Sequence, residues 1–134
     1  MLKHFKIYEF VDKETYELLG EQAWKLFNMD LLLDLDWLRF KLDKKITVND
    51  WYWGGEYQNR GFRTAKSTVG STTSQHRSGN AVDFTVDGMT AEEVRQFILD
   101  NEDTYEDINR MEDDVSWVHI DGKHVVERIH LFKP

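Results

Sequence analysis

The sequence has no cysteine, few basic residues and no long apolar run, and each of these absences removes a class of protein. Without cysteine there is no disulfide scaffold and no thiolate-ligated zinc. A bound metal would therefore be held by histidine, aspartate or glutamate. The 17 Lys and Arg residues stand against 25 Asp and Glu residues, a formal net charge of −8. This balance argues against nucleic-acid binding and against electrostatic docking to an anionic membrane or wall polymer.

Membrane and export signals are also lacking. The apolar patch Leu31–Leu33 is followed at once by Asp34 and Asp36, so we expect no transmembrane helix and no insertion into a membrane. The first residues, MLKHFK, have no long apolar run after their basic residues, so a secretory signal is not evident. We therefore expect the product to be cytoplasmic as synthesised.

What the chain does contain is enough apolar material for a packed core. Hydrophobic residues make up 40% of the sequence and aromatic residues 13%, which argues against disorder. A length of 134 residues fits one domain with a buried interior. We predict a single domain over residues 1–134.

Helical periodicity marks three segments. Residues 9–27 are predicted to form one amphipathic helix, and residues 31–42 a second one after a break and N-cap at 28–30. The second helix has two apolar stripes, so we expect burial on more than one side: Leu33, Trp37 and Phe40 on one stripe, and Leu35, Leu38 and Leu42 on the other. The third helix, residues 91–99, is predicted to begin after an N-cap at Thr90, with Glu92 and Glu93 complementing the helix dipole.

Alternating apolar and polar residues predict five short strands, at 45–50, 81–86, 107–111, 116–120 and 126–132. Turns at 112–115 and 121–123 are predicted to join the last three as an antiparallel meander. Residues 51–79 form a long loop, whose aromatic residues favour order and packing on the core. The predicted fold class is α+β: N-terminal helices packed on a small, mainly antiparallel sheet with one inserted helix.

Two blocks of sequence carry the chemistry of a metal site. His76 lies in the loop seven positions before Asp83, and His119 lies within a predicted strand that points Asp121 to the same side. Two imidazoles and a carboxylate form a donor set that zinc hydrolases use while leaving a fourth position for water. A solvated loop histidine and a core histidine would explain the same residues separately, so the spacing alone leaves metal binding open. Three further histidines lack such neighbours and are interpreted as surface or partly buried residues: His4, His124 and His130.

The order of these motifs resembles that of a known family. The residues that carry the resemblance are Gly61-Phe62-Arg63-Thr64, Val69-Gly70, Ser74-x-His76-x-x-Gly79-x-Ala81-x-Asp83 and Trp117-Val118-His119-x-Asp121. In this pattern the chain is similar to the zinc D-alanyl-D-alanine carboxypeptidases. That family includes phage L-alanyl-D-glutamate peptidases and shares its fold with the amino-terminal domain of hedgehog proteins. The resemblance extends over residues 49–121.

The resemblance implies a site built around one zinc ion. His76, Asp83 and His119 would be its ligands. Arg63 would hold the carbonyl or carboxylate of the substrate, and Ser74 would contact a terminal carboxylate or brace the loop. The implied reaction is hydrolysis of a peptidoglycan stem-peptide bond that involves a D-amino acid, either D-Ala-D-Ala or L-Ala-D-Glu. Zinc would lower the pKa of its water toward ~7, and a nearby carboxylate would take the proton.

That carboxylate is the residue the resemblance assigns least directly. Many relatives have Glu or Asp three residues before the last histidine, where this chain has Ser116, and others, including hedgehog, have an acid further upstream. We predict Glu112, at a strand end, as the general base, with Asp113 and Asp114 as alternatives. At least two of these three are expected to be a solvated acidic turn. Asp121 either orients a site group or begins the turn at 121–123.

Three functions are compatible with these patterns. The first is a zinc peptidase that acts on peptidoglycan stem peptides, as a phage-type lysis enzyme or a bacterial wall enzyme. The second is a non-catalytic zinc-binding module of the same fold, which binds wall peptide or a protein partner and is favoured by Ser116. The third is a metal-free structural protein. The missing secretory signal fits a phage-type enzyme that reaches the wall after release or delivery.

Overall fold

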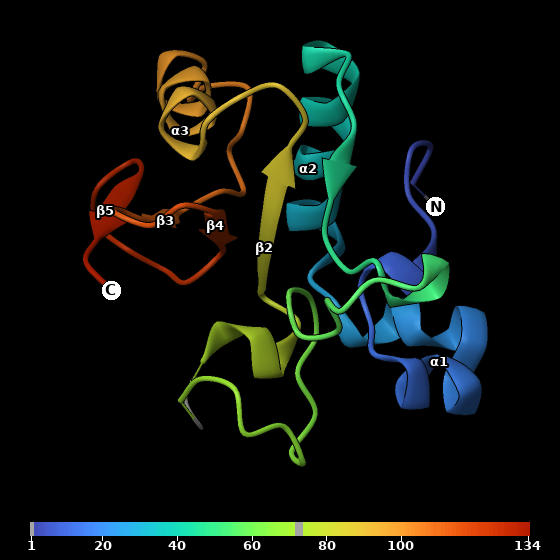
Figure 1. Ribbon diagram of the computed structural model, residues 1–134. Helices are drawn as coiled ribbons and strands as arrows, with labels where there is room; N and C mark the ends of the chain where they lie inside the picture. Colours follow the sequence, from blue (N-terminus) through green and yellow to red (C-terminus); the bar gives the residue numbers. More distant parts are fainter. Residues whose placement is uncertain (1, 72–73) are drawn as a thin grey trace.

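The computed structural model describes residues 2–71 and 74–134 and shows an α+β fold (Figure 1). Among these residues the main helices are α1 (Lys13–Leu19), α2 (Met29–Leu42) and α3 (Ala91–Asp100). The strands are β1 (Ile46–Thr47), β2 (Ala81–Val86), β3 (Arg110–Glu112), β4 (Val118–Asp121) and β5 (His130–Phe132). Short 3-10 helices lie at Ile7–Glu9, Gly20–Leu26, Trp51–Trp53 and Gln75–Ser78. The predicted fold class is confirmed; within the predicted loop 51–79, residues 72 and 73 lie outside the described residues.

Local capping signals define the two long helices. Asn28 accepts a hydrogen bond from the Leu31 amide at 3.4 Å and thereby caps α2. Thr90 and Glu93 form a reciprocal capping box at the start of α3, with bonds of 3.1 and 2.8 Å. Both helices were predicted to within one or two residues, because their start signals lie within one turn of the helix itself.

The prediction of one helix over residues 9–27 is wrong. The chain forms the α-helix α1, and then Gly20, with a φ of 52°, turns it into a 3-10 helix over Gly20–Leu26. A left-handed backbone angle breaks the helical hydrogen-bond ladder, and glycine adopts it without the steric penalty of a side chain. The apolar residues whose spacing suggested one continuous helix are therefore divided between α1 and the 3-10 helix that follows it.

The core lies between the helices and the sheet. Leu31, Leu32, Leu35 and Leu38 of α2 are fully buried, and so are Val82 and Phe84 of β2. Figure 1 shows α2 alongside β2, with α3 near β3, β4 and β5. Of the two apolar stripes predicted to be buried, the one with Leu35 and Leu38 is buried, and the prediction is wrong for the other: Leu33, Trp37 and Phe40 are 50%, 46% and 56% exposed. No helix of the described residues is long and apolar enough to cross a membrane.

The sheet has the order β1-β2-β4-β3-β5. β2 pairs antiparallel with β1 and β4, and β4 pairs antiparallel with β3. The predicted meander is wrong at its last step, because β5 pairs with β3 in parallel instead of with β4. Arg128, just before β5, donates hydrogen bonds to the carbonyls of Tyr105 (2.9 Å) and Ile108 (3.5 Å), just before β3. These contacts hold the residues that precede β5 beside those that precede β3, and the two strands then pair in parallel.

Candidate metal centre

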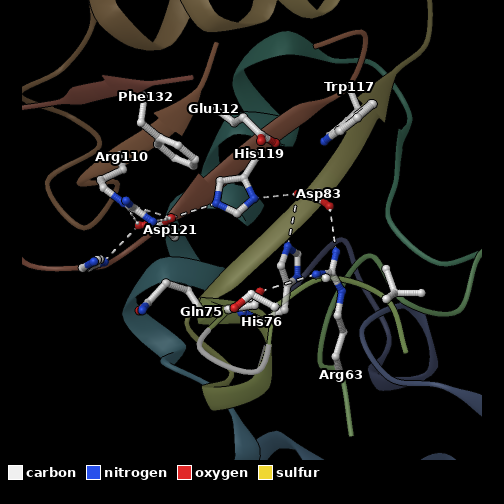
Figure 2. Close-up of a pocket in the computed structure, with 15 residues that line it drawn as sticks. Arg63, Gln75, His76, Asp83, Arg110, Glu112, Trp117, His119, Asp121 and Phe132 are labelled. Atoms are coloured by element: carbon white, nitrogen blue, oxygen red, sulfur yellow. Dashed lines mark hydrogen bonds and ion pairs between the residues drawn. The ribbon is translucent and has the colours of Figure 1, made fainter. Parts of the chain in front are cut away.

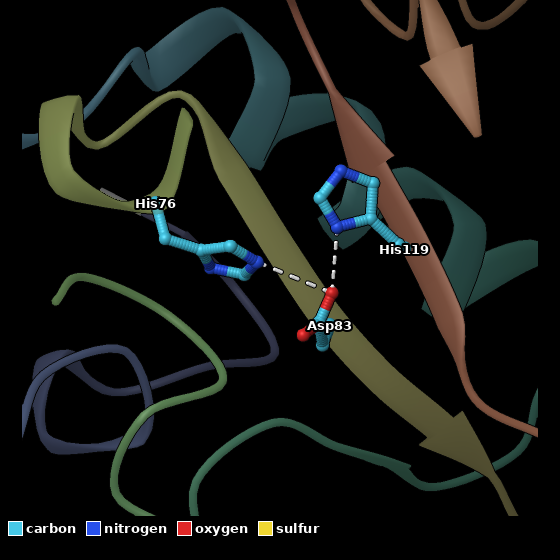
Figure 3. Close-up of side chains that lie close together, drawn as sticks. All are labelled: His76, Asp83 and His119. Carbon is cyan, nitrogen blue, oxygen red and sulfur yellow. Dashed lines mark hydrogen bonds and ion pairs between the residues drawn. The ribbon is translucent and has the colours of Figure 1, made fainter. Parts of the chain in front are cut away.

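Three side chains from separate parts of the chain meet beside the middle of the sheet (Figure 3). Asp83 Oδ1 lies 3.2 Å from His76 Nε2 and 2.7 Å from His119 Nδ1. One ligand atom from each residue lies within 4.8 Å of the other two. All three side chains are buried, with 2% to 8% of each residue exposed. The structure thus brings together the three residues that the sequence suggested as metal ligands.

Strand pairing places two of these residues. Asp83 of β2 stands directly opposite His119 of β4 in the antiparallel register, so their side chains lie on the same face. The other side of β2 is held by the loop, because the Asp83 amide donates to the Arg60 carbonyl at 2.7 Å. The carboxylate is therefore fixed from both edges of its strand.

A short 3-10 helix, Gln75–Ser78, places the third residue, His76. Ser74 precedes it and accepts a hydrogen bond from the His76 amide at 3.3 Å. Gly79 ends the helix with a φ of 70°, and a Cβ at this position would lie 1.8 Å from the Leu26 carbonyl oxygen. Only glycine allows this close approach between the loop and the N-terminal helices.

The hydrogen bonds of the two imidazoles leave their remaining nitrogens as acceptors. His76 Nδ1 lies 2.8 Å from the Gly61 carbonyl, which requires a proton on Nδ1 and a lone pair on Nε2. His119 Nε2 lies 2.8 Å from Asp121 Oδ2, which favours the lone pair on Nδ1. Both free lone pairs then face the Asp83 carboxylate, and three acceptors converge. Such an arrangement calls for a cation.

A metal ion fits this cation position. Buried His76 Nε2 has no hydrogen-bond partner, although it lies 3.2 Å from Asp83 Oδ1. Ligands of a tetrahedral ion bound at about 2 Å lie roughly 3.3 Å apart, close to this separation. A buried nitrogen left unpaired costs about 1–3 kcal/mol, a cost that metal ligation would remove. The donor set and its spacing therefore suit a divalent ion that prefers nitrogen and oxygen.

The pKa values of the site show the same need for positive charge. Burial alone would lower the pKa of His119, but hydrogen bonds to Asp121 and Asp83 outweigh it and raise the pKa to about 9. Burial alone would raise the pKa of Asp83, but its interactions with the neighbouring His119 and His76 rings bring the pKa well below its ordinary value. In the metal-free protein a proton on His119 thus holds the carboxylates and imidazoles together.

Asp121 and Arg110 support His119 from its other side. Asp121 is completely buried and receives two hydrogen bonds from Arg110, at 3.0 and 2.8 Å, besides its contact with His119. It also accepts from the Lys123 amide at 3.1 Å, so its carboxylate contacts both the histidine and the turn. The Phe132 ring meets the His119 ring edge-on at 5.5 Å and fixes its plane. Figure 2 shows this arrangement.

Arg63 lies on the other flank of the site. Its Nη2 donates to Asp83 Oδ2 at 3.3 Å, its Nη1 to Ser74 Oγ at 3.4 Å and its Nε to the Asn59 carbonyl at 2.8 Å. Burial lowers the pKa of the guanidinium below its ordinary value, against the opposing effect of Asp83. Arg63 therefore orients the carboxylate so that Oδ1 faces the histidines, and Ser74 braces the loop and the arginine together.

A hollow of about 440 Å³ opens over the three candidate ligands, and the acidic residues take different positions around it. Glu112 lies on its wall with Trp117, and Figure 2 shows both labelled side chains at its edge. Asp113 and Asp114 lie outside this wall and pair with Lys133, Asp113 at 3.3 Å. Of the three acids considered from the sequence, the structure brings only Glu112 to the hollow.

The sequence did not single out several residues that shape this site. Arg110 and Phe132 come from β3 and β5, whose pairing was not predicted. Arg95 of α3 is 4% exposed and donates to the carbonyls of Trp117 at 3.1 Å and Val115 at 3.2 Å. It thus holds the turn between β3 and β4. The only available signal was a basic residue on the apolar side of a predicted helix.

Two imidazoles and a carboxylate, buried below an open hollow with an acid on its wall, define a site of the metallohydrolase type. The model of one protein family, peptidase M15, matches residues 4–121 of the sequence. The chain therefore belongs to the peptidase M15 family, a family of metallopeptidases. No curated protein and no solved structure matches the chain.

Proposed function

We propose that this protein is a zinc-dependent peptidase that hydrolyses a stem-peptide bond of peptidoglycan, at a bond involving a D-amino acid. The observation that carries the proposal is the convergence of three buried acceptors, His76 Nε2, Asp83 Oδ1 and His119 Nδ1, below an open hollow. Membership of the peptidase M15 family supports the peptidase activity, and the sequence resemblance described above supports the choice of substrate. One zinc ion would be held by these three residues.

Each residue of the site then has a chemical task. Zinc held there would supply a water of lowered pKa, ready to attack a carbonyl. Glu112, on the wall of the hollow, would take the proton of that water and pass it to the leaving amine. Arg63, anchored to Asp83 Oδ2, would stabilise negative charge developing on the substrate carbonyl.

The electrostatics favour Glu112 over its neighbours as the base. A hydrogen bond from the Asp114 amide and another from Lys133 lower the pKa of Asp113, which makes it a weaker proton acceptor. Asp114 is exposed and bonds the same lysine. Glu112 has no such lysine partner among the described ion pairs, and it lies on the side of the hollow that also presents His119.

We further propose that the protein acts as a phage-type lysis enzyme, made in the cytoplasm and reaching the wall after release or delivery. The motif order shared with phage L-alanyl-D-glutamate peptidases supports this setting. The alternative function is a zinc-binding module without catalysis, which binds wall peptide or a protein partner. The observation that favours this alternative is Ser116, at the position where many relatives carry the acid.

Digestion of purified cell walls tests the peptidase function. The zinc-loaded protein is incubated with walls of several stem-peptide chemistries, and new amino groups are counted while metal content is measured in parallel. Release of amino groups, lost on chelation and restored by zinc, is the expected result. Bound metal without any new amino group, across all wall types, would show that the protein is not a peptidase of this substrate.

Single substitutions separate the enzyme from the binding module. Glu112→Gln is expected to lower turnover at least 100-fold with zinc retained, because the proton acceptor is lost while the ligands remain. Asp113→Asn and Asp114→Asn are the matched controls, and both are expected to stay within about threefold of the wild type. Equal turnover in all three variants would contradict the assignment of Glu112.

A further inference from the structure

We propose that one exposed face of this protein docks on the surface of a membrane that contains anionic lipid, without any segment crossing that membrane. The face consists of an apolar stripe of α2 and the exposed lysines around it. We call it the lysine-rimmed face, and its residues are Leu33, Trp37, Phe40, Lys3, Lys41, Lys44 and Lys45. The proposal concerns a surface apart from the metal centre and does not depend on the peptidase function.

The centre of the lysine-rimmed face is apolar and uncovered. Leu33, Trp37 and Phe40 follow one another at helical spacing on α2, and each is about half exposed. The rings of Trp37 and Phe40 lie 5.2 Å apart, and His4 stacks on Phe40 at 6.0 Å. These four side chains line a hollow of about 350 Å³, together with Lys3. Contiguous apolar surface on the outside of a protein marks an interaction site.

The lysines at the C-terminal end of α2 direct their charges to solution. Lys41 Nζ lies 5.7 Å from the centre of the Trp37 ring. Lys44 and Lys45 line a second hollow, of about 400 Å³, whose wall also includes Phe40. All three lysines are exposed, and none of them forms an ion pair with a residue that the structure describes. Their charges are therefore available to a partner.

Two acids line the same hollows, and only one of them is exposed. Asp36 is buried and accepts hydrogen bonds from the amides of Lys3 at 3.0 Å and His4 at 2.9 Å. This contact attaches the N-terminal segment to α2 and places Lys3 beside the apolar stripe. Asp43 is exposed at the end of α2. The exposed lysines outnumber this acid, so the face is positive in a chain whose net charge is −8.

The local charge of the face matters more for docking than the net charge of the chain. At physiological ionic strength, charges are screened beyond about 8 Å, so an anionic surface interacts mainly with the charges nearest to it. Each lysine close to anionic lipid adds to the attraction. The net charge argued against electrostatic docking when the sequence was taken as a whole. The fold changes that expectation because it gathers lysines from two separate segments on one face.

Apolar and basic side chains together favour a lipid surface over other partners. A tryptophan among apolar neighbours suits the boundary between headgroups and acyl chains, where lysines keep their charges at the headgroups. An anionic wall polymer would pair with the lysines but would leave Leu33 and Phe40 in water. A second copy of the chain, in a symmetric contact, would set the lysines of one face against those of the other, and like charges oppose this.

The lysine-rimmed face is separate from the metal centre. No described residue that lines its two hollows also lines the hollow over the candidate ligands. Figure 1 shows the N-terminus and α2 on one side of β2, with β3, β4 and β5 on the other. Docking through this face therefore does not involve the residues that would bind the metal or the substrate.

Co-sedimentation with vesicles tests the proposal. The full chain is mixed with vesicles of phosphatidylcholine alone, and with vesicles in which about a third of the lipid is phosphatidylglycerol. We expect binding to the anionic vesicles to be about tenfold tighter or more, and to be largely lost when NaCl is raised from ~0.1 M to ~0.5 M. Equal binding to both kinds of vesicle, or binding to neither, would overturn the proposal.

A pair of double variants separates the local charge from the net charge. Lys41→Glu with Lys44→Glu is expected to lower affinity for the anionic vesicles about tenfold or more. Lys13→Glu with Lys25→Glu changes the net charge equally, at exposed positions that line neither hollow, and is expected to lower it less than about threefold. Equal losses in the two double variants would show that the face is not the docking site.

A second pair of variants tests the apolar centre. Trp37→Ala is expected to lower affinity for the anionic vesicles about fivefold or more, because the ring no longer enters the lipid boundary. Trp53→Ala is the matched control, since that ring is 60% exposed and lines neither hollow, and it should leave the affinity unchanged. Circular dichroism and the Tm check that every variant is folded. Equal affinity in Trp37→Ala and the wild type would overturn the proposal.

Two further measurements distinguish the other occupants. Binding to a purified anionic wall polymer without binding to the anionic vesicles would overturn the proposal in favour of the polymer. A dimer in sedimentation equilibrium without lipid, dissociated by Trp37→Ala, would overturn it in favour of a second copy. Since none of these experiments uses a peptide substrate, their outcome is independent of whether the protein is a peptidase.

Discussion

His119 lies between two carboxylates, and this position links metal binding to pH. Its Nδ1 faces Asp83 at 2.7 Å and its Nε2 faces Asp121 at 2.8 Å. Although burial opposes the charge, these contacts raise the pKa of His119 to about 9. The metal-free protein therefore carries a proton at neutral pH in the place where a metal ligand must offer a lone pair. A metal ion and this proton compete for the same nitrogen.

We predict that zinc binding at pH 7.5 releases at least one proton, because His119 must lose its proton before it can bind the ion. Isothermal titration calorimetry in two buffers of different ionisation enthalpy measures this number directly. Because the pKa of His119 is raised to about 9, the contribution of His119 to this release should fall as the pH rises through 9 and approach zero by pH 10, where only the proton lost from the zinc-bound water remains. An apparent enthalpy that does not depend on the buffer at pH 7.5 would contradict the prediction.

Asp34 of α2 is a second residue with a shifted pKa, far from the metal centre in sequence. Burial raises its pKa to about 6, and the neighbouring Asp107 and Glu106 add to the shift, against the hydrogen bond that Asp34 accepts from the Asp107 amide at 2.9 Å. Since the folded pKa lies above the ordinary value of 3.8, ionised Asp34 destabilises the fold above pH 6. Below pH 4 the carboxyl is protonated in both states and has no such effect.

We predict that Asp34→Asn stabilises the protein by about 1 kcal/mol at pH 8 and by almost nothing at pH 4. The asparagine keeps an oxygen for the Asp107 amide and carries no charge. Urea unfolding at the two pH values measures the difference. Glu17→Gln, at an exposed position on α1, is the control and should not change the pH dependence of stability. A loss of stability at pH 8 would contradict the account.

At the scale of elements, the sequence was sufficient to predict those helices whose start signals and apolar spacing lie within a few residues of one another. α2 and α3 were predicted because their caps and apolar spacing lie within the segments themselves. The break at Gly20 was missed, because apolar spacing does not report the backbone angle of one residue. The partner of β5 was also missed. It depends on Arg128 reaching three carbonyls more than 19 residues earlier in the chain.

Helix α3 supports the site through one buried side chain. Arg95 donates to the carbonyls of Val115 and Trp117, and its nearest carboxylate, Glu92, lies at 3.2 Å. These carbonyls belong to the turn between β3 and β4, which carries Glu112 at one end. The position of the proposed base therefore depends on a guanidinium that does not line the hollow.

We predict that Arg95→Lys lowers kcat at least tenfold and stability by about 1–3 kcal/mol, with zinc content unchanged. Lysine keeps the charge but cannot bond two carbonyls in the fixed geometry of a guanidinium. Glu92→Gln is the matched control: that side chain is largely exposed, and we expect little effect on either quantity. Loss of zinc in Arg95→Lys, or an unchanged kcat, would show that Arg95 has a different role.

At the scale of the whole molecule, the site depends on contacts between distant segments. The motifs in the sequence were sufficient to propose His76, Asp83 and His119 as ligands, and the pairing of β2 with β4 accounts for their convergence. From the sequence, Glu112 was predicted as the general base only because it lies at a strand end, and Asp113 and Asp114 stayed as alternatives. That choice depends on which side chain the fold directs into the hollow, and Lys133, close to the end of β5, holds two of them outside.

The metal centre joins the loop that carries His76 to strands β2 and β4, so a bound ion should stabilise the entire fold. We predict that chelation lowers the Tm by about 10 °C. The reason is that a ligand present at 1,000 times its Kd contributes about 4 kcal/mol to folding. Thermal unfolding of the zinc-loaded protein with and without a chelator measures the shift. His76→Ala, which lacks one ligand, should show a much smaller difference. An identical Tm in both conditions would instead favour a structural protein that binds no metal.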